Sequence, residues 1–305
     1  MELGSSFSIS IIGKRRLFGR RRKSPGRPRI GFDILAEMSN INSSWAILLA
    51  AGVGSRLDPL TRAWPKCLMP VHGRPLLEYW LLNLKQSKFG QVIVNTHHHA
   101  EQVNAFLERT CFSEWVHQAP EPHLLGTAST LREHSENIGS SGVLVAHADN
   151  WCNADLIEFR IFHEHHRPPG TVITMMTFVT NAPSNCGIVT LDDHGIVTGF
   201  FEKVENPPGD IANGAVYLIE PEVMAWIRAH PWATDFSTDV LPEFLGRIAT
   251  WQNHGIHRDI GVLDALLEAQ QDPPMLEENY PVDEWAKTFR AHPIHSKIKQ
   301  FSNQQ

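Results

Sequence analysis

The sequence has 305 residues, of which 42% are hydrophobic and 20% are charged. This composition is typical of a globular protein and excludes a disordered chain, a collagen or a coiled coil as the overall class. No stretch reaches the roughly 18 apolar residues that a membrane-spanning helix needs. The four cysteines include no CxxC pair, which favours a reducing, cytoplasmic location over a disulfide framework.

The net charge of −6 is unevenly distributed. Residues 1–37 hold nine Lys or Arg and three acids, a net charge of +6, so the remainder carries −12. A secretory signal is disfavoured because the apolar run Phe7 to Ile12 precedes the arginines. A nucleic-acid-binding arm or an organellar transit peptide is left open by the arginines alone. Because Met38 begins a short polar lead into an apolar strand, we expect residues 1–40 to be a disordered leader or an over-extended reading frame without function.

From Trp45 onward, short β-type runs alternate with helical patterns, which is typical of an α/β domain with a mostly parallel sheet. Strands buried on both faces are expected at 45–50, 91–96, 142–148 and 170–179. Helices are expected near 76–86, 100–109, 127–137 and 154–165.

Beyond Pro183 the pattern changes to shorter strands. They are expected at 186–192, 196–203 and 214–219, with a hairpin turn at 191–195, and predict a small antiparallel excursion. Helices near 220–229 and 239–246, a strand near 248–252 and a helix from about 262 follow. We therefore predict one domain over 41–272 and a tail, 273–305, that is too short for a second domain.

The segment LAAGVGSRLDPLTRAWPKCLMP, residues 49–70, directly follows the first predicted strand. Gly52 and Gly54 allow a tight turn whose backbone N–H groups can approach a ligand, and such a nest binds phosphate oxygens. Arg56 offers a planar fork of donors suited to a pyrophosphate, and Lys66 offers a compact charge. The spacing is neither that of a Walker A loop nor that of the dinucleotide-binding GxGxxG motif.

Together with PVHGRP at 70–75, this segment resembles the signature of the sugar-1-phosphate nucleotidylyltransferases, LAAGxGxRLxPLTxxxPKxLxPVxGKP. Further motifs extend the resemblance from about Trp45 to Ala269. It implies a single Rossmann-like α/β domain with a mixed, mostly parallel sheet and a small antiparallel sugar-binding excursion. It also implies transfer of a nucleotidyl group from an NTP to a sugar 1-phosphate with Mg²⁺ as cofactor, no nucleic-acid or membrane partner, and a possible homo-oligomer.

The resemblance assigns roles to residues of the loop. The arginine of GxR would hold the departing pyrophosphate, the lysine of PK the α-phosphate, and the lysine of an EK element the sugar phosphate. These catalytic positions are Arg56, Lys66 and Lys203. The nucleotide-binding positions, which include an LGTA element at 125–128, are Ala50, Ala51, Gly52, Gly54, Ser55, Glu121, Gly126 and Thr127.

Two aspartates match the metal ligands of the family. Asp149 follows the strand expected at 142–148, although Ala148 replaces the usual glycine and a lone Asp there is as often a helix N-cap. Asp259 matches the DIGTP element, which here lacks its Thr and Pro. Two carboxylates suit a hydrated Mg²⁺ that also binds substrate phosphates.

The sugar-binding positions implied by the resemblance are Gly187, Glu202, Lys203 and Asn213. Glu202 and Lys203 belong to FEK at 201–203, in which Val204 replaces the proline of FxEKP. Gly187 and Asn213 could equally be turn or bulge residues. The histidine clusters 97–99 and 163–166 suggest metal binding, but we interpret them as surface or loop residues.

The LGTA element resembles that of guanylyl- and uridylyltransferases more than that of the thymidylyl branch. We expect GTP with mannose- or heptose-1-phosphate first, and a UTP- or dTTP-dependent hexose-1-phosphate enzyme is the alternative. An inactive regulatory subunit that binds sugar nucleotides is an interpretation of another class. It is disfavoured because such proteins usually lose Arg56, Lys66 or a metal aspartate, and all of these are present.

Overall fold

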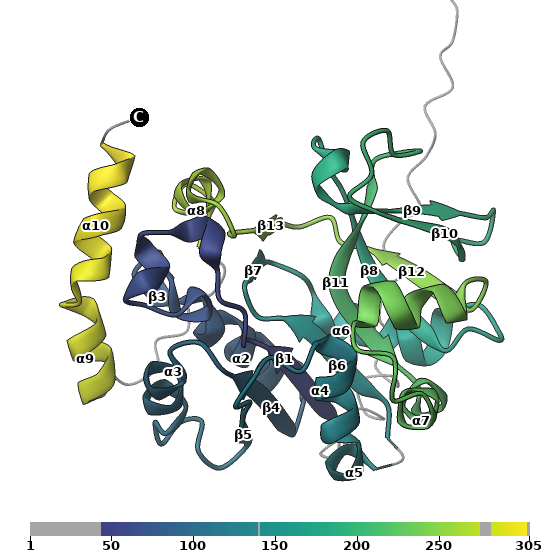
Figure 1. Cartoon of the computed structure of the whole chain (residues 1–305), viewed down its shortest axis with the longest axis horizontal. Coiled ribbons are helices and arrows are strands. Elements are labelled where there is room, and N and C mark those ends of the chain that lie inside the picture. Colours follow the sequence, from purple (N-terminus) through teal and green to yellow (C-terminus); the bar gives the residue numbers. More distant parts are fainter. Residues whose placement is uncertain (1–43, 140, 275–281, 304–305) are drawn as a thin grey trace, which may run out of the picture. The chain divides into compact units, whose positions relative to one another are not determined.

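The central sheet has nine strands within the part of the chain that the computed structural model describes, namely residues 44–139, 141–274 and 282–303. Its strands follow the order β10-β9-β11-β6-β1-β4-β5, while β8 pairs with β11 and β12 pairs with β8 (Figure 1). The leader predicted at residues 1–40 lies outside the described residues. Across the described ranges, no helix is both long and apolar enough to cross a membrane.

One half of the sheet is parallel. β1 (Trp45–Leu49) lies between β4 (Gln91–Thr96) and β6 (Val143–His147), and β4 also pairs with β5 (Val116–Pro120). β1, β4 and β6 are almost entirely buried, as expected for strands covered on both faces, whereas the edge strand β5 has exposed residues. Their carboxyl ends lie at one edge, where open parallel sheets bind ligands.

The other half is antiparallel and contains the predicted excursion. β11 (Ile211–Ile219) runs antiparallel to β6, to β8 (Ile173–Val179) and to β9 (Gly187–Leu191). β9 and β10 (Val197–Glu202) form the hairpin, and β12 (Ile248–Gln252) runs parallel to β8. The expected α/β fold with a mixed sheet and an antiparallel excursion is confirmed.

Alternating residues of β1 point to the two faces of the sheet and enter two separate hydrophobic clusters. Ala46 and Leu48 join the cluster under one set of helices, which comprises α2 (Leu76–Gln86), α3 (Ala100–Leu107), α6 (Leu156–Ile161), α8 (Leu263–Ala269), α9 (Glu284–Arg290) and α10 (Pro293–Ser302). Ile47 and Leu49 join the other cluster, under α4 (Thr127–Glu133), α5 (Ser135–Ile138) and α7 (Pro221–Ala229). The core is therefore divided by the sheet, with helices on both faces.

Several expected helices end differently. The prediction of one helix over 239–246 is wrong. Residues Phe236–Val240 form a π turn, which is followed by a 3-10 turn at Leu241–Phe244. Pro242 has no N–H to donate, so an α-helical ladder cannot continue through it. The helix near 127–137 is interrupted at His134, and the helix near 154–165 becomes a π turn from Phe162.

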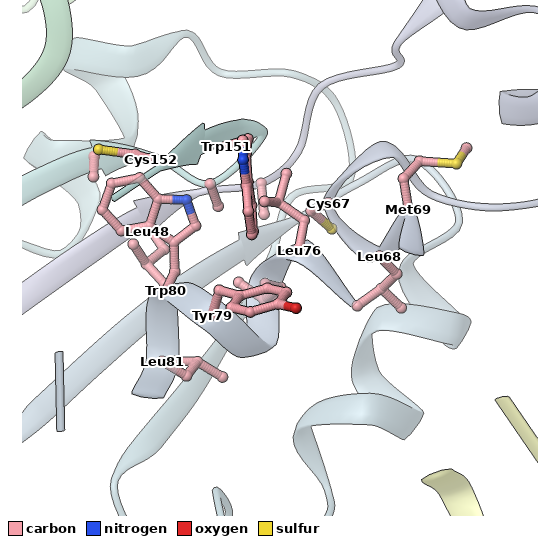
Figure 2. Packing of buried hydrophobic residues seen from close by; sticks show 14 of the residues in the cluster. Leu48, Cys67, Leu68, Met69, Leu76, Tyr79, Trp80, Leu81, Trp151 and Cys152 are labelled. Carbon is pink, nitrogen blue, oxygen red and sulfur yellow. The ribbon is translucent and has the colours of Figure 1, made fainter. Parts of the chain in front are cut away.

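The sequence reasoning missed β5 and two short ladders. One is β2 (Pro70–Val71) with β3 (Arg74–Pro75), and the other is β7 (Asn150–Cys152) with β13 (His257–Asp259). β7 is anchored by Trp151, which is fully buried and meets Tyr79 edge to face with ring centroids 4.8 Å apart (Figure 2). Trp80 Nε1 also donates to the Asn150 carbonyl oxygen at 2.9 Å.

Candidate functional site

Four charged side chains from three segments of the chain meet at the carboxyl end of the parallel strands. Lys66 Nζ lies 2.7 Å from Asp149 Oδ2 and 2.8 Å from Asp259 Oδ1. Arg56 Nη2 lies 3.1 Å from Asp259 Oδ2. The structure thus brings together the two predicted phosphate-binding cations and the two predicted metal ligands.

The short β7–β13 ladder positions the two carboxylates. Asp149 follows β6 and directly precedes β7, while Asp259 ends β13 and lies opposite Asn150. Residues more than a hundred positions apart are thereby fixed as neighbours. The N-cap of α6 is Asp155, whose Oδ1 accepts from the N–H groups of Ile157 and Glu158, so Asp149 is not needed for capping.

The surroundings of Lys66 and Asp259 favour the charged form of both side chains. Burial alone would lower the pKa of Lys66, but Asp149 and Asp259 outweigh that effect and raise it. Burial would raise the pKa of the Asp259 carboxyl, but Lys66 and Arg56 lower it. The side chain of Lys66 is only 6% exposed, whereas that of Arg56 is 63% exposed. Lys66 is therefore fixed inside the cluster and Arg56 stands at its rim.

The glycine-rich loop is closely packed at Gly54 and has free space around Gly52. Gly54 has φ 67°, a Cβ there would lie 3.1 Å from Lys66 Cβ, and its carbonyl oxygen accepts from Thr61 Oγ1 at 2.9 Å. A Cβ at Gly52 would have no heavy atom within 4 Å. Ala50 N donates to Asn95 Oδ1 at 2.6 Å. Beside the loop, Ala51 is buried and Ser55 is exposed.

The expected nucleobase element is tightly integrated into the fold. Glu121 is buried, and its carboxylate accepts from Asn95 Nδ2 at 2.9 Å and from Leu125 N at 3.2 Å. Gly126 has φ 91°, and a Cβ there would lie 2.5 Å from the Thr234 carbonyl oxygen. Thr127 Oγ1 accepts from Phe236 N at 2.6 Å. The polar atoms of Glu121 and Thr127 are thus engaged within the protein.

The expected sugar-binding residues lie on the antiparallel excursion. Gly187 pairs with Glu202 across β9 and β10, and a Cβ at Gly187 would lie 2.5 Å from Glu202 Oε2. Lys203 Nζ lies 3.3 Å from Glu202 Oε1. Asn213 lies at an irregularity of β11, where its Nδ2 donates to Tyr217 Oη at 2.7 Å and its Oδ1 accepts from Ala215 N at 3.0 Å.

Cys186 directly precedes Gly187 of the expected sugar-binding element. Burial chiefly raises the pKa of its thiol, and the charges of Asp259 and Glu202 raise it further. The Cys186 carbonyl oxygen also accepts from Lys203 N at 3.1 Å. The thiol therefore lies within electrostatic reach of both the cluster and the sugar element.

From the sequence, we interpret the histidine clusters 97–99 and 163–166 as surface or loop residues. This interpretation is correct for the first cluster and wrong for one residue of the second. His97, His98 and His99 lie in the loop between β4 and α3, as expected. His163 is buried, and its Nδ1 lies 2.7 Å from Thr174 Oγ1. In the π turn that carries it, His163 faces the core, whereas His165 and His166 are exposed. Among the residues that the structure describes, no group of three or more His, Cys, Asp or Glu could hold a metal ion.

Sequence reasoning also missed the supports of the loop. The Thr61 carbonyl oxygen lies 3.1 Å from His98 Nε2 and 3.0 Å from His99 Nε2. On the other side, Trp64 stacks on Phe289 of α9 with centroids 5.8 Å apart. The spacing of apolar residues over 293–302 could have revealed α10, but no local pattern indicates the contact with Trp64.

Comparisons with known proteins identify the family and the fold of the chain. A family model described as nucleotidyl transferase matches residues 45–274. Mannose-1-phosphate guanylyltransferase of Mycobacterium tuberculosis is 26% identical over 234 residues, which cover 74% of this chain and 64% of that protein. UTP--glucose-1-phosphate uridylyltransferase of Synechocystis is 29% identical over 214 residues, 66% of this chain and 55% of that protein. The chain spans about three fifths of the length of the curated relatives it matches.

A solved structure from Bacillus anthracis, described as a glucose-1-phosphate thymidylyltransferase, superposes with a TM-score of 0.68 at 20% identity. The match covers 80% of this chain and 99% of that chain. At this identity the likeness shows a shared fold. Since the family model covers most of the sequence and includes all four residues of the charged cluster, the chain belongs to the nucleotidyl transferase family.

Proposed function

We propose that the protein is a sugar-1-phosphate nucleotidylyltransferase that converts an NTP and a sugar 1-phosphate into an NDP-sugar and pyrophosphate. The observation that carries this proposal is the cluster of Arg56, Lys66, Asp149 and Asp259. Phosphoryl-type transfer is catalysed chiefly by positioning and by positive charge where negative charge develops. A cluster of this composition at the carboxyl end of a parallel sheet supplies both.

The glycine-rich loop would bind the triphosphate. The open space at Gly52 leaves room for phosphate oxygens against the backbone of Ala51 to Ser55, and Ala50 is fixed by its bond to Asn95. Arg56, at the exposed rim, would hold the departing pyrophosphate, and Lys66 would stabilise the charge on the α-phosphate. Both cations act by charge, so neither needs to lose a proton.

Asp149 and Asp259 are the residues that would hold Mg²⁺. Their carboxylates already share one cation, Lys66 Nζ, within 2.8 Å, so their spacing suits a single shared positive charge. Oxygen ligands from two carboxylates fit a hydrated Mg²⁺. Such an ion, when bound, neutralises phosphate charge.

The excursion would bind the sugar phosphate. Glu202 would accept from sugar hydroxyls, with Gly187 and Asn213 beside it, and Lys203, which is 62% exposed, would orient the attacking phosphate. A non-bridging oxygen of that phosphate attacks the α-phosphorus in line. Because the phosphate is already ionised at pH 7, neither a protein nucleophile nor a general base is needed.

Glu121, Gly126 and Thr127 would shape the nucleobase site, with Glu121 acting through the backbone that it fixes. We favour GTP with mannose- or heptose-1-phosphate, which is supported by the relative from Mycobacterium tuberculosis. UTP with glucose 1-phosphate is the second candidate, supported by the relative from Synechocystis. A cytoplasmic location is supported by the four free cysteines.

The test is pyrophosphate release by the full chain with Mg²⁺, across GTP, UTP, dTTP, CTP and ATP and a panel of sugar 1-phosphates. Release with one pair of substrates would establish the reaction and name both. Silence in all pairs, combined with clear thermal shifts on adding NDP-sugars, would favour a regulatory subunit without catalysis. An inactive variant, Asp149→Asn, controls for contaminating activity.

A further inference from the structure

Lys66 occupies the position at which its two carboxylate partners could share a ligand. Its Nζ lies within hydrogen-bond distance of both Asp149 and Asp259, and its side chain is almost fully buried. Asp259 is further engaged by Arg56 Nη2 at 3.1 Å and by the N–H of Gly261 at 2.8 Å. Two cations thus balance two anions, and the cluster has no net charge to attract a divalent ion.

A divalent cation entering this cluster would meet the ammonium of Lys66 before it could bind both carboxylates. Like charges at a few ångströms in a partly buried site repel strongly, because solvent screens them poorly. Release of the ammonium into the site without another anion would leave it buried and unpaired, which is costly. The carboxylates can therefore be freed only when Lys66 gains a new anionic partner.

The glycine-rich loop, taken as the phosphate site, would hold such a partner within reach of Lys66. Its aliphatic stem runs beside the glycine-rich loop, since a Cβ on Gly54 would lie 3.1 Å from Lys66 Cβ and 3.5 Å from Lys66 Cδ. A phosphate seated on that loop would be a neighbour of the same side chain. The Lys66 stem has several rotatable bonds, so a change of rotamer is the movement that would exchange one partner for the other.

We propose that Lys66 substitutes for the divalent cation between Asp149 and Asp259 until the phosphates of a nucleotide draw it away. This inference rests on the proposed function, because it takes the loop to be a phosphate site. It makes metal binding dependent on nucleotide binding, and by thermodynamic linkage each increases the affinity for the other. The nucleotide-free protein therefore binds divalent ions weakly although it presents two carboxylates side by side.

The experiment is a titration of the nucleotide-free full chain with Mn²⁺, followed by the electron paramagnetic resonance signal of the free ion. Lys66→Met removes the ammonium and keeps an unbranched stem, and we expect it to bind Mn²⁺ about tenfold more tightly or better than wild type, since one like charge is removed. Arg56→Gln, which removes the exposed cation, should have a smaller effect. Lys287→Met, which removes a surface ammonium paired with Glu284, is the matched control and should leave affinity unchanged.

The double variant Lys66→Met with Asp149→Asn should return to weak binding, which would locate the gained affinity at the carboxylate pair. Equal Mn²⁺ affinities of wild type and folded Lys66→Met would overturn the proposal. If Lys66→Met does not fold by circular dichroism, the wild type decides alone: tight Mn²⁺ binding without nucleotide would overturn the proposal, and weak binding would support it. Pyrophosphate release is measured separately. If the wild type turns over substrate but Lys66→Met does not bind Mn²⁺ more tightly, only this inference is rejected. If Lys66→Met binds Mn²⁺ more tightly but the wild type releases no pyrophosphate, only the proposed function is rejected.

Discussion

Trp64 stacks on Phe289 with an interplanar angle of 25°, and this contact links the glycine-rich segment to α9. Trp64 lies two residues before Lys66, and its Nε1 donates to the Leu68 carbonyl oxygen at 2.8 Å. The ring of His292 approaches Trp64 from the same side, with centroids 4.1 Å apart. Helices α9 and α10 lie beyond the family-matched region 45–274, yet they support the turn that carries Lys66.

This contact predicts that Phe289→Ala lowers the free energy of unfolding by about 3–5 kcal/mol, because a buried aromatic ring is replaced by a cavity. Urea denaturation measures the loss. Phe301→Ala is the control, since Phe301 is only partly buried near the end of α10, and it should cost about 1 kcal/mol. Similar losses for the two variants would show that the Trp64 contact does not anchor these helices.

Lys66→Ala should lose most of its turnover and remain folded. By analogy with the removal of one donor to a developing negative charge, we expect kcat to fall about 100-fold or more. Folding should survive because the side chains of Asp149 and Asp259 are 27% and 50% exposed, so each carboxylate can turn toward water once the ammonium is gone. Pyrophosphate release measures the rate and circular dichroism the fold. If Lys66→Ala keeps near wild-type turnover, Lys66 has no role in catalysis.

The sequence predicts the long elements well because each carries its own signal. β1 is a run of apolar residues and β4 is rich in β-branched residues, and α2 begins directly after Pro75, at which the chain is extended. β7 and β13 carry no such signal, since each has three residues and exists through pairing with a segment distant in sequence. The convergence of Asp149 and Asp259 could therefore be inferred from resemblance but not from local pattern.

His163 predicts acid sensitivity. Burial, with help from Arg167 and Arg160, lowers the pKa of His163 to about 3, well below the ordinary value of 6.5. Between these values the unfolded chain binds a proton that the folded protein does not, so stability is lost as pH falls through this window, by up to about 1.4 kcal/mol per pH unit. Urea unfolding at pH 7 and pH 5 measures the loss.

Other buried groups also titrate in this window, so the comparison must be made against a variant. His163→Gln keeps a polar side chain and cannot titrate there. It should flatten the dependence of stability on pH by nearly one proton between pH 6 and pH 4. The same slope in both proteins would mean that His163 becomes protonated in the folded state.

An added methyl group should affect stability at one glycine of the site and nucleotide binding at another. Gly126→Ala places a Cβ 2.5 Å from the Thr234 carbonyl oxygen at φ 91°, so we expect it to destabilise the fold by roughly 1–3 kcal/mol. Gly52→Ala places a Cβ in open space, so unfolding should change by about 1 kcal/mol or less. If the phosphates approach the backbone at residue 52, the new methyl group occupies their place and the KM for the NTP rises, while the KM for the sugar 1-phosphate stays the same. An unchanged KM for the NTP in Gly52→Ala would move the triphosphate away from this turn.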